Sequence, residues 1–163
     1  MVQFSVSHLR TDMIPEAYAL VRIAVPEVTF ERWQEFADAL IANGGGILGV
    51  FAGDATLHGL ATYEIDNVLR HGRRLKVDTI VTFELTRLAP ARKALCEALE
   101  CRAAELGCTA MVLAMRSHGY ADDASVKAEG WTTLGFGLDS ITFARNLQPG
   151  VAIVSSATAE TAV

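Results

Sequence analysis

The chain has 163 residues, of which 51% are hydrophobic, and a mean hydropathy of +0.28. This length predicts a single domain with a sizeable buried core. The net charge of −5 argues against general nucleic-acid binding, which requires a basic face. No apolar run approaches the about 18 residues of a membrane span, and the first residues lack a signal-peptide pattern, so we expect a cytoplasmic protein.

The first part of the chain predicts one strand and two helices. Residues 3–9 alternate in polarity, as short strands do. Thr11 and Asp12 are suited to cap a helix that extends to about residue 24. A second helix is expected between Thr29 and Asn43. Its apolar stripe, which predicts either core packing or the wall of a substrate groove, is Phe30, Trp33, Phe36, Ala37, Leu40 and Ile41.

The middle of the chain predicts three consecutive antiparallel strands. Residues 47–53 and 56–65 form the first two, with a turn at Gly53 and Asp54. A further turn leads into the third, over residues 75–85. Strict alternation in this third strand would place on one face Val77, Thr79, Val81, Phe83 and Leu85.

A helix and a buried strand are expected next. Leu95 and Leu99 recur at helical spacing after Pro90, and Gly107 suits a left-handed helix end. The apolar residues 108–115 then predict a strand. A strand that joins a sheet through a helix requires a parallel crossover.

The last part of the chain predicts a loop, a short helix and two strands. The helix is expected to end at Gly130, and the strands to span residues 130–136 and 139–147. The small residues of 148–163 predict a flexible tail, which leaves residues 1–147 as the domain.

The start of the helix at Pro90 has an unusual charge pattern. Ala89 is a poor cap, and Arg92 and Lys93 lie in the first turn with Arg87 just upstream. Cations are unfavourable at the positive end of a helix dipole. The pattern is typical of an anion site made of amides and basic side chains, or of cations that simply point into solvent.

The three cysteines predict neither a disulfide framework nor a zinc site. Cys96, Cys101 and Cys108 are odd in number and lack zinc-ligand spacing. We expect them to act as buried small hydrophobes, and we expect no metal.

The order of these elements resembles the GCN5-related N-acetyltransferases over residues 3–147. Four features carry the resemblance: Ile80-Val81-Thr82 before a turn with Arg87, the helix end at 100–108, Gly130-Trp131 in place of the family's Gly-Phe, and a substrate-side helix at 26–42. The resemblance implies an α+β fold in α/β/α layers. Its sheet would be mixed, mostly antiparallel and splayed, with six to seven strands and about four helices.

The resemblance also implies where acetyl-CoA would bind as co-substrate. In the family it lies between the fourth and fifth strands, with its pantetheine arm on the fourth strand, here the backbone of Ile80, Val81 and Thr82. The pyrophosphate positions would be Arg87, Leu88, Ala89, Ala91, Arg92 and Lys93. Pro90 and Arg92 replace two family glycines, so one amide donor is lost and bulk is added.

Candidate catalytic residues follow from the same resemblance. Many family members protonate the leaving thiolate with a tyrosine four residues before the Gly-Phe, a position that Val126 takes here. Tyr120 is the nearest replacement, unless it only packs on the domain edge. Asp78 is a candidate base, or else a cross-strand partner for one of the arginines at 70–74.

Weaker candidates for the base are two more carboxylates and two histidines: Glu64, Asp66, His58 and His118. Two functions follow. The first is an acetyl-CoA-dependent N-acetyltransferase for a small amine or an exposed amino group; the resemblance allows a homodimer through the last strands, which is common in the family, and leaves the oligomeric state open. The second is a non-catalytic module for ligand sensing or protein association with a decayed cofactor turn.

Overall fold

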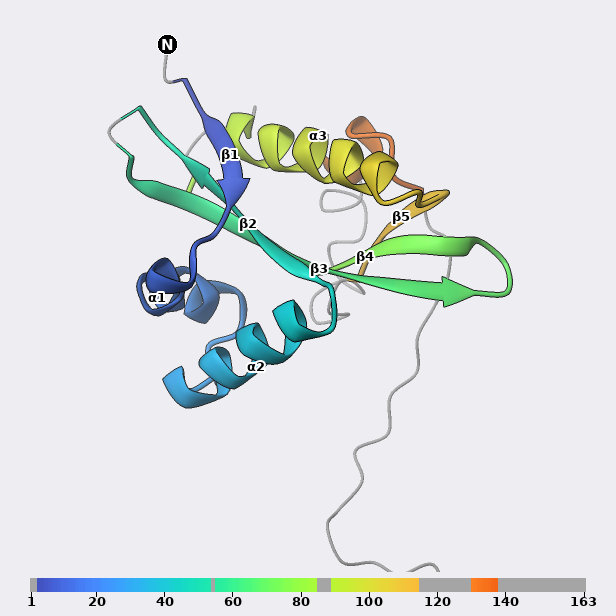
Figure 1. Ribbon diagram of the computed structural model, residues 1–163. Helices are drawn as coiled ribbons and strands as arrows, with labels where there is room; N and C mark the ends of the chain where they lie inside the picture. The colour runs from blue at the N-terminus through green and yellow to red at the C-terminus, as the bar shows by residue number, and fades with distance from the viewer. Residues whose placement is uncertain (1–2, 54, 85–88, 115–129, 138–163) are drawn as a thin grey trace, which may run out of the picture.

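The computed structural model describes residues 3–53, 55–84, 89–114 and 130–137 (Figure 1). Five strands form one sheet in these ranges: β1 (Ser5–His8), β2 (Gly46–Phe51), β3 (Leu57–Val68), β4 (Gly72–Thr82) and β5 (Ala110–Leu113). The strands lie side by side in chain order. Neighbours are antiparallel except β4 and β5, which are parallel. The predicted meander and parallel crossover are therefore confirmed.

Helices cover both faces of this sheet (Figure 1). A 3-10 helix, η1 (Thr11–Met13), leads into α1 (Ile14–Ala24), which packs beside α2 (Phe30–Ala42) on one face. The opposite face carries α3 (Pro90–Glu105). The expected α/β/α layering is thus confirmed. None of the helices in the described ranges has the length and apolar character needed to cross a bilayer.

Two buried clusters correspond to the two faces. One joins α1 and α2 to the sheet through Ile14, Ala17, Trp33, Ala37, Leu60 and Val81. The other joins α3 to the sheet through Leu48, Val50, Leu75, Val77, Leu95 and Leu99. Within the stripe predicted for α2, Trp33 is buried and its indole donates to the Ile14 carbonyl at 2.7 Å, whereas Phe36 and Ile41 are exposed.

The two N-terminal helices begin in different ways. The start of α2 after Thr29 is confirmed, and the Thr29 hydroxyl caps the helix by accepting a bond from the Arg32 amide at 3.2 Å. The predicted caps of α1 are wrong. Thr11 and Asp12 lie inside η1, and Met13 precedes the helix without a side-chain cap. Pro15 in the first turn has no amide hydrogen for a cap to bind.

A β-bulge divides β4 into two parts. Thr62 of β3 lies opposite Thr79, but Tyr63 lies opposite Val77, so Asp78 is an extra residue. The buried Thr62 hydroxyl accepts the Thr79 amide at 3.1 Å, which satisfies the displaced backbone. An extra residue reverses the alternation of every side chain that follows. The prediction that Val77 and Val81 share one face is therefore wrong, because Val77 packs in the cluster under α3 and Val81 in the cluster under α1 and α2.

The short described segment at the end of the fold also differs from prediction. Residues 130–133 are helical and 134–135 form a turn, with Gly135 at φ +84°. The strand predicted for 130–136 is wrong, and Gly130 does not end a helix. The amides of Gly135 and Phe136 bond back to the carbonyls of Thr132 and Trp131, which fixes the turn.

The sheet therefore has five strands in the described ranges, fewer than the six to seven expected. The other predicted strand, at 139–147, the start of the short helix before residue 130 and the tail at 148–163 lie outside the described residues.

Candidate functional site

The strands β4 and β5 separate where the bulge begins. They pair from Arg74 opposite Ala110 to Val77 opposite Leu113, and the Ala114 amide makes a last bond to the Val77 carbonyl at 2.8 Å. Past that point, no described strand pairs with β4 on this side. Within the described ranges, the second part of β4 is therefore an open edge of the sheet.

The register of β3 identifies the backbone groups at this open edge. The Phe83 amide donates to the backbone carbonyl of His58 in β3 at 2.7 Å. Because successive residues of a strand direct their peptide groups to opposite sides, Val81 and Phe83 face β3, whereas Ile80 and Thr82 face the open edge. Of the three predicted pantetheine partners, Ile80 and Thr82 have main-chain groups available there.

The amino end of α3 lies just past this edge and is capped by a residue of another segment. Ala89 precedes the helix in the left-handed region, at φ 42°, and offers no side-chain cap. The Glu84 carboxylate instead accepts the amides of Ala91 at 2.6 Å and Arg92 at 3.3 Å. The prediction that Ala89 is a poor cap is confirmed, but the sequence did not indicate that Glu84 accepts these amides.

The two cations of the first turn of α3 have different surroundings. The Arg92 guanidinium lies 5.3 Å from the centre of the Trp131 ring, a cation–π contact, and its side chain is half-buried. The Lys93 ammonium is exposed and lies 3.9 Å from the Glu97 carboxylate. Lys93 fits the alternative of a solvated cation, and Arg92 does not.

Asp78, the candidate base, occupies the bulge itself. Its side chain is exposed, and the Thr79 hydroxyl lies within 3.4 Å of its carboxylate. The structural alternative for Asp78 was an ion pair with an arginine on the neighbouring part of the sheet. Among the described residues, Asp66 forms such a pair instead, with its carboxylate 2.7 Å from Nε of Arg74. The hydrogen bond from Arg74 lowers the pKa of Asp66. Asp66 is therefore held in an ion pair.

Glu64 and His58 also have structural partners. Lys76 donates to the Glu64 carboxylate at 2.6 Å, and this bond raises the pKa of Lys76. The His58 ring packs edge-on against Phe4, with 5.7 Å between ring centres. Both therefore have contacts within the sheet. The remaining predicted positions, Arg87, Leu88, His118, Tyr120 and Val126, lie outside the described residues.

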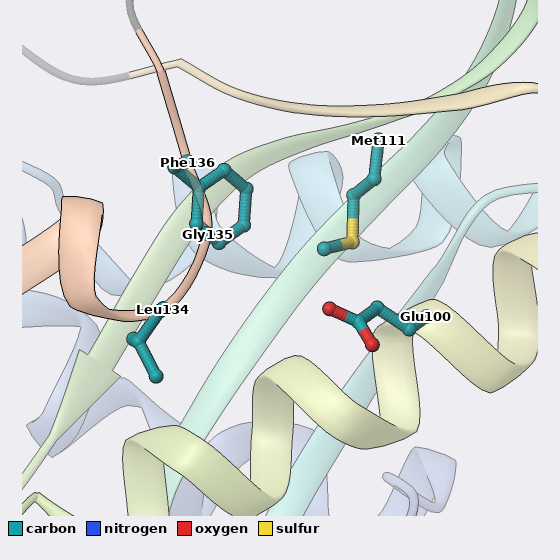
Figure 2. Close-up of a pocket in the computed structure, with 5 residues that line it drawn as sticks. All are labelled: Glu100, Met111, Leu134, Gly135 and Phe136. Carbon is teal, nitrogen blue, oxygen red and sulfur yellow. The ribbon is translucent and has the colours of Figure 1, made fainter.

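A hollow separates α3 from residues 130–137. Its two adjoining parts measure about 190 Å³ and about 240 Å³ and share Glu100 and Leu134. Figure 2 shows Glu100 of α3 and Met111 of β5 across from Leu134 and Phe136 in the first part. Cys96 lines the second part, and burial raises its pKa to about 11.

The prediction that the cysteines are buried is confirmed only near the amino end of α3. Cys96 is buried as predicted and Cys108 is half-buried, but Cys101 is exposed, so the expectation is wrong there. All three are free thiols. In the described residues, no three His, Cys, Asp or Glu side chains come together as metal ligands.

The pair predicted to stand for the family's Gly-Phe lies inside a helical turn. Gly130 and Trp131 belong to the helical residues 130–133, and Gly135 and Phe136 come after them at the turn. The prediction that Gly130 and Trp131 follow the end of a helix is therefore wrong.

Comparison with known proteins shows the fold. No family model and no curated protein matches the sequence. An aminoglycoside N-acetyltransferase AAC(6')-Iy in complex with CoA matches with a TM-score of 0.75 at 14% identity, over 90% of this chain and 96% of that one. Glucosamine-6-phosphate N-acetyltransferase from Arabidopsis thaliana matches with a TM-score of 0.64 at 16% identity, over 90% and 99%.

A structure described as a transcriptional regulator from Bacillus halodurans also matches, with a TM-score of 0.71 at 12% identity, over 89% of this chain and all of that one. The chain thus has the fold of the GCN5-related N-acetyltransferases, as the sequence predicted.

Proposed function

We propose that the protein is an N-acetyltransferase that transfers an acetyl group from acetyl-CoA to an amine. The observation that carries the proposal is the edge of β4, where Ile80 and Thr82 present peptide groups that pair with no strand of the described ranges. An extended amide-bearing chain such as pantetheine can add to such an edge as a further strand does. Glu84, two residues past the end of β4, contacts the amino end of α3, where amides favour phosphate.

The residues present fit this co-substrate. Ile80 and Thr82 would hold the pantetheine arm through the main chain. The amides of Ala91 and Arg92, with the Arg92 and Lys93 side chains, would meet the pyrophosphate together with Ala89 and with Arg87 and Leu88 from the preceding turn. Acetyl-CoA would supply an activated thioester. No metal is part of this proposal.

The chain's own groups would act on the amine and the leaving thiolate. Asp78, exposed beside the open edge, would accept the proton of the incoming amine. Tyr120 remains the proposed proton donor for the thiolate.

The acceptor class follows from charge. The chain carries 19 acidic against 14 basic residues, which favours approach of a cationic amine over an anionic substrate. One matched structure is named for an aminoglycoside, a cationic amine of this kind, whereas another is named for glucosamine 6-phosphate, an amine that also carries an anionic phosphate. A small amine or an exposed amino group of a protein therefore fits the proposal.

One observation favours a second candidate, a non-catalytic module with this fold. Glu84 already occupies the two amides at the start of α3, so in this arrangement they are not free for a phosphate. One matched structure is described as a transcriptional regulator rather than a transferase. This candidate predicts no acetyl transfer to any amine.

A thiol-release assay distinguishes the two candidates. The protein is incubated with acetyl-CoA and a panel of amines, including aminoglycosides, amino sugars, polyamines and peptides, and free CoA is measured. We expect release that depends on one amine class and falls at least tenfold in Asp78→Asn. Binding of acetyl-CoA without release for any amine would favour the non-catalytic module.

A further inference from the structure

The amino end of α3 holds an anion that belongs to the chain itself. Glu84 Oε1 lies 2.6 Å from the Ala91 amide nitrogen and Oε2 lies 3.3 Å from that of Arg92, so one carboxylate spans both amides. No acidic residue lies in the first turn of the helix, and Ala89 provides no cap. Glu84 is therefore the side chain that satisfies this end.

The chemistry of this contact is that of a bound phosphate. Two adjacent backbone amides at the positive end of a 16-residue helix donate to two oxygens of one anion. Because each amide has one hydrogen, a phosphate cannot use these donors while the carboxylate keeps them. Ala91 is fully buried while the Glu84 carboxylate is in place.

A second observation points to a missing partner on the same face. After the bulge, Ile80 packs in the α3 cluster, so by alternation Thr82 and Glu84 project toward α3 as well. The Thr82 hydroxyl oxygen is buried, and no described residue hydrogen-bonds to it. Buried polar atoms without a partner are rare, and a ligand oxygen would satisfy this hydroxyl.

We propose that the Glu84 carboxylate is an internal competitor for the pyrophosphate of acetyl-CoA, so that Glu84 sets the affinity of the site. This inference rests on the proposed function. To bind, the co-substrate displaces the carboxylate from the Ala91 and Arg92 amides, and the exchange costs part of the binding free energy. Removing the negative charge should therefore tighten binding, although it removes a side chain that lines the site.

The test uses two probes, acetyl-CoA and inorganic pyrophosphate, titrated calorimetrically into the full chain. The variants are Glu84→Gln, which keeps a neutral acceptor for the helix amides, and Glu84→Ala. Glu35→Gln on α2 is the matched control, because it removes one exposed carboxylate far from α3 in sequence. We expect both Glu84 variants to bind acetyl-CoA about tenfold more tightly than wild type. We expect both variants also to bind pyrophosphate more tightly than wild type does.

The outcomes separate this inference from the proposed function. Equal acetyl-CoA affinity in wild type and both Glu84 variants would overturn the inference and leave the transferase in place. An equal gain in Glu35→Gln would also overturn it, since net charge would then explain the effect. Binding by Glu84→Gln but not by wild type would support the inference and contradict catalysis by the natural chain. No binding by any form would overturn both.

Discussion

The two ends of α3 are held by different means. At the carboxyl end, Gly107 adopts φ +68° and the amides of Gly107 and Cys108 return to the carbonyls of Ala104 and Ala103 at 3.1 Å and 2.9 Å. Every group involved lies within a few residues in the sequence. At the amino end, Ala89 adopts φ 42°, and Glu84 supplies the cap from beyond the end of β4.

The difference shows which features of a helix can be inferred from its own residues. A glycine after an amphipathic run predicts the carboxyl end, because only glycine adopts the left-handed conformation without strain. The cap at the amino end depends on which face of the sheet Glu84 projects from. That face is set by the bulge at Asp78, which the alternation of polarity does not indicate.

The largest expected effect comes from disturbing the bulge. In Thr62→Val, a side chain of similar shape loses the hydroxyl that accepts the Thr79 amide. The part-buried Thr79 amide is then unsatisfied, so we expect the free energy of unfolding to fall by about 2 kcal/mol in urea denaturation. Thr79→Val is the control, because its hydroxyl faces only the exposed Asp78. Equal losses in both variants would show that the bulge is not held by Thr62.

The next effect isolates the cap at the amino end. Glu84→Ala removes the acceptor of two helix amides and a negative charge at the positive end of the dipole. We expect a loss of about 1 kcal/mol in the free energy of unfolding, typical of a removed helix cap. A stability unchanged from wild type would mean that water or another group serves the amides equally well.

A pair of reciprocal substitutions compares the two left-handed residues directly. Gly107→Ala places a side chain at φ +68° in open space, so only backbone strain opposes it, and we expect a loss of about 1 kcal/mol. Ala89→Gly relieves the same strain at φ 42° and should leave stability unchanged or raise it. Thermal unfolding measures both. Loss of stability in Ala89→Gly would contradict the geometry at the amino end.

The smallest effect concerns the two cysteines on opposite sides of α3. We expect a thiol reagent at neutral pH to modify the exposed Cys101 rapidly and the buried Cys96 only after unfolding. Peptide mapping by mass spectrometry follows each site. Burial raises the pKa of Cys96 from 9.0 to about 11, so the unfolded chain loses this proton first as pH rises. Stability should therefore decline between these two values, and less so in Cys96→Ala.

Much of the fold follows from pattern in the sequence. The order of strands, the crossover helix, the Thr29 cap and the Gly107 end all depend on local signals of polarity, capping and glycine. Such signals act over a few residues and survive in a single sequence. They sufficed to indicate the transferase-like fold that the structural comparison shows.

The site was less accessible to sequence reasoning, because its geometry depends on contacts between distant segments. The bulge needs the buried Thr62 on another strand, and the cap needs Glu84 on the α3 face. The strand predicted for 130–136 rests on aromatic and β-branched residues, which favour strands, but 130–133 form a helical turn. Its contact with Arg92 joins segments that are far apart in the chain.

Backbone amide NMR during titration with acetyl-CoA tests the central claim most directly, because it reports on single peptide groups of the open edge. We predict the largest shift changes at Ile80, Thr82, Ala91 and Arg92, with a smaller change at Val81, whose amide faces β3. Changes confined to α1 and α2, or no changes at millimolar acetyl-CoA, would contradict the proposal that this edge binds the co-substrate.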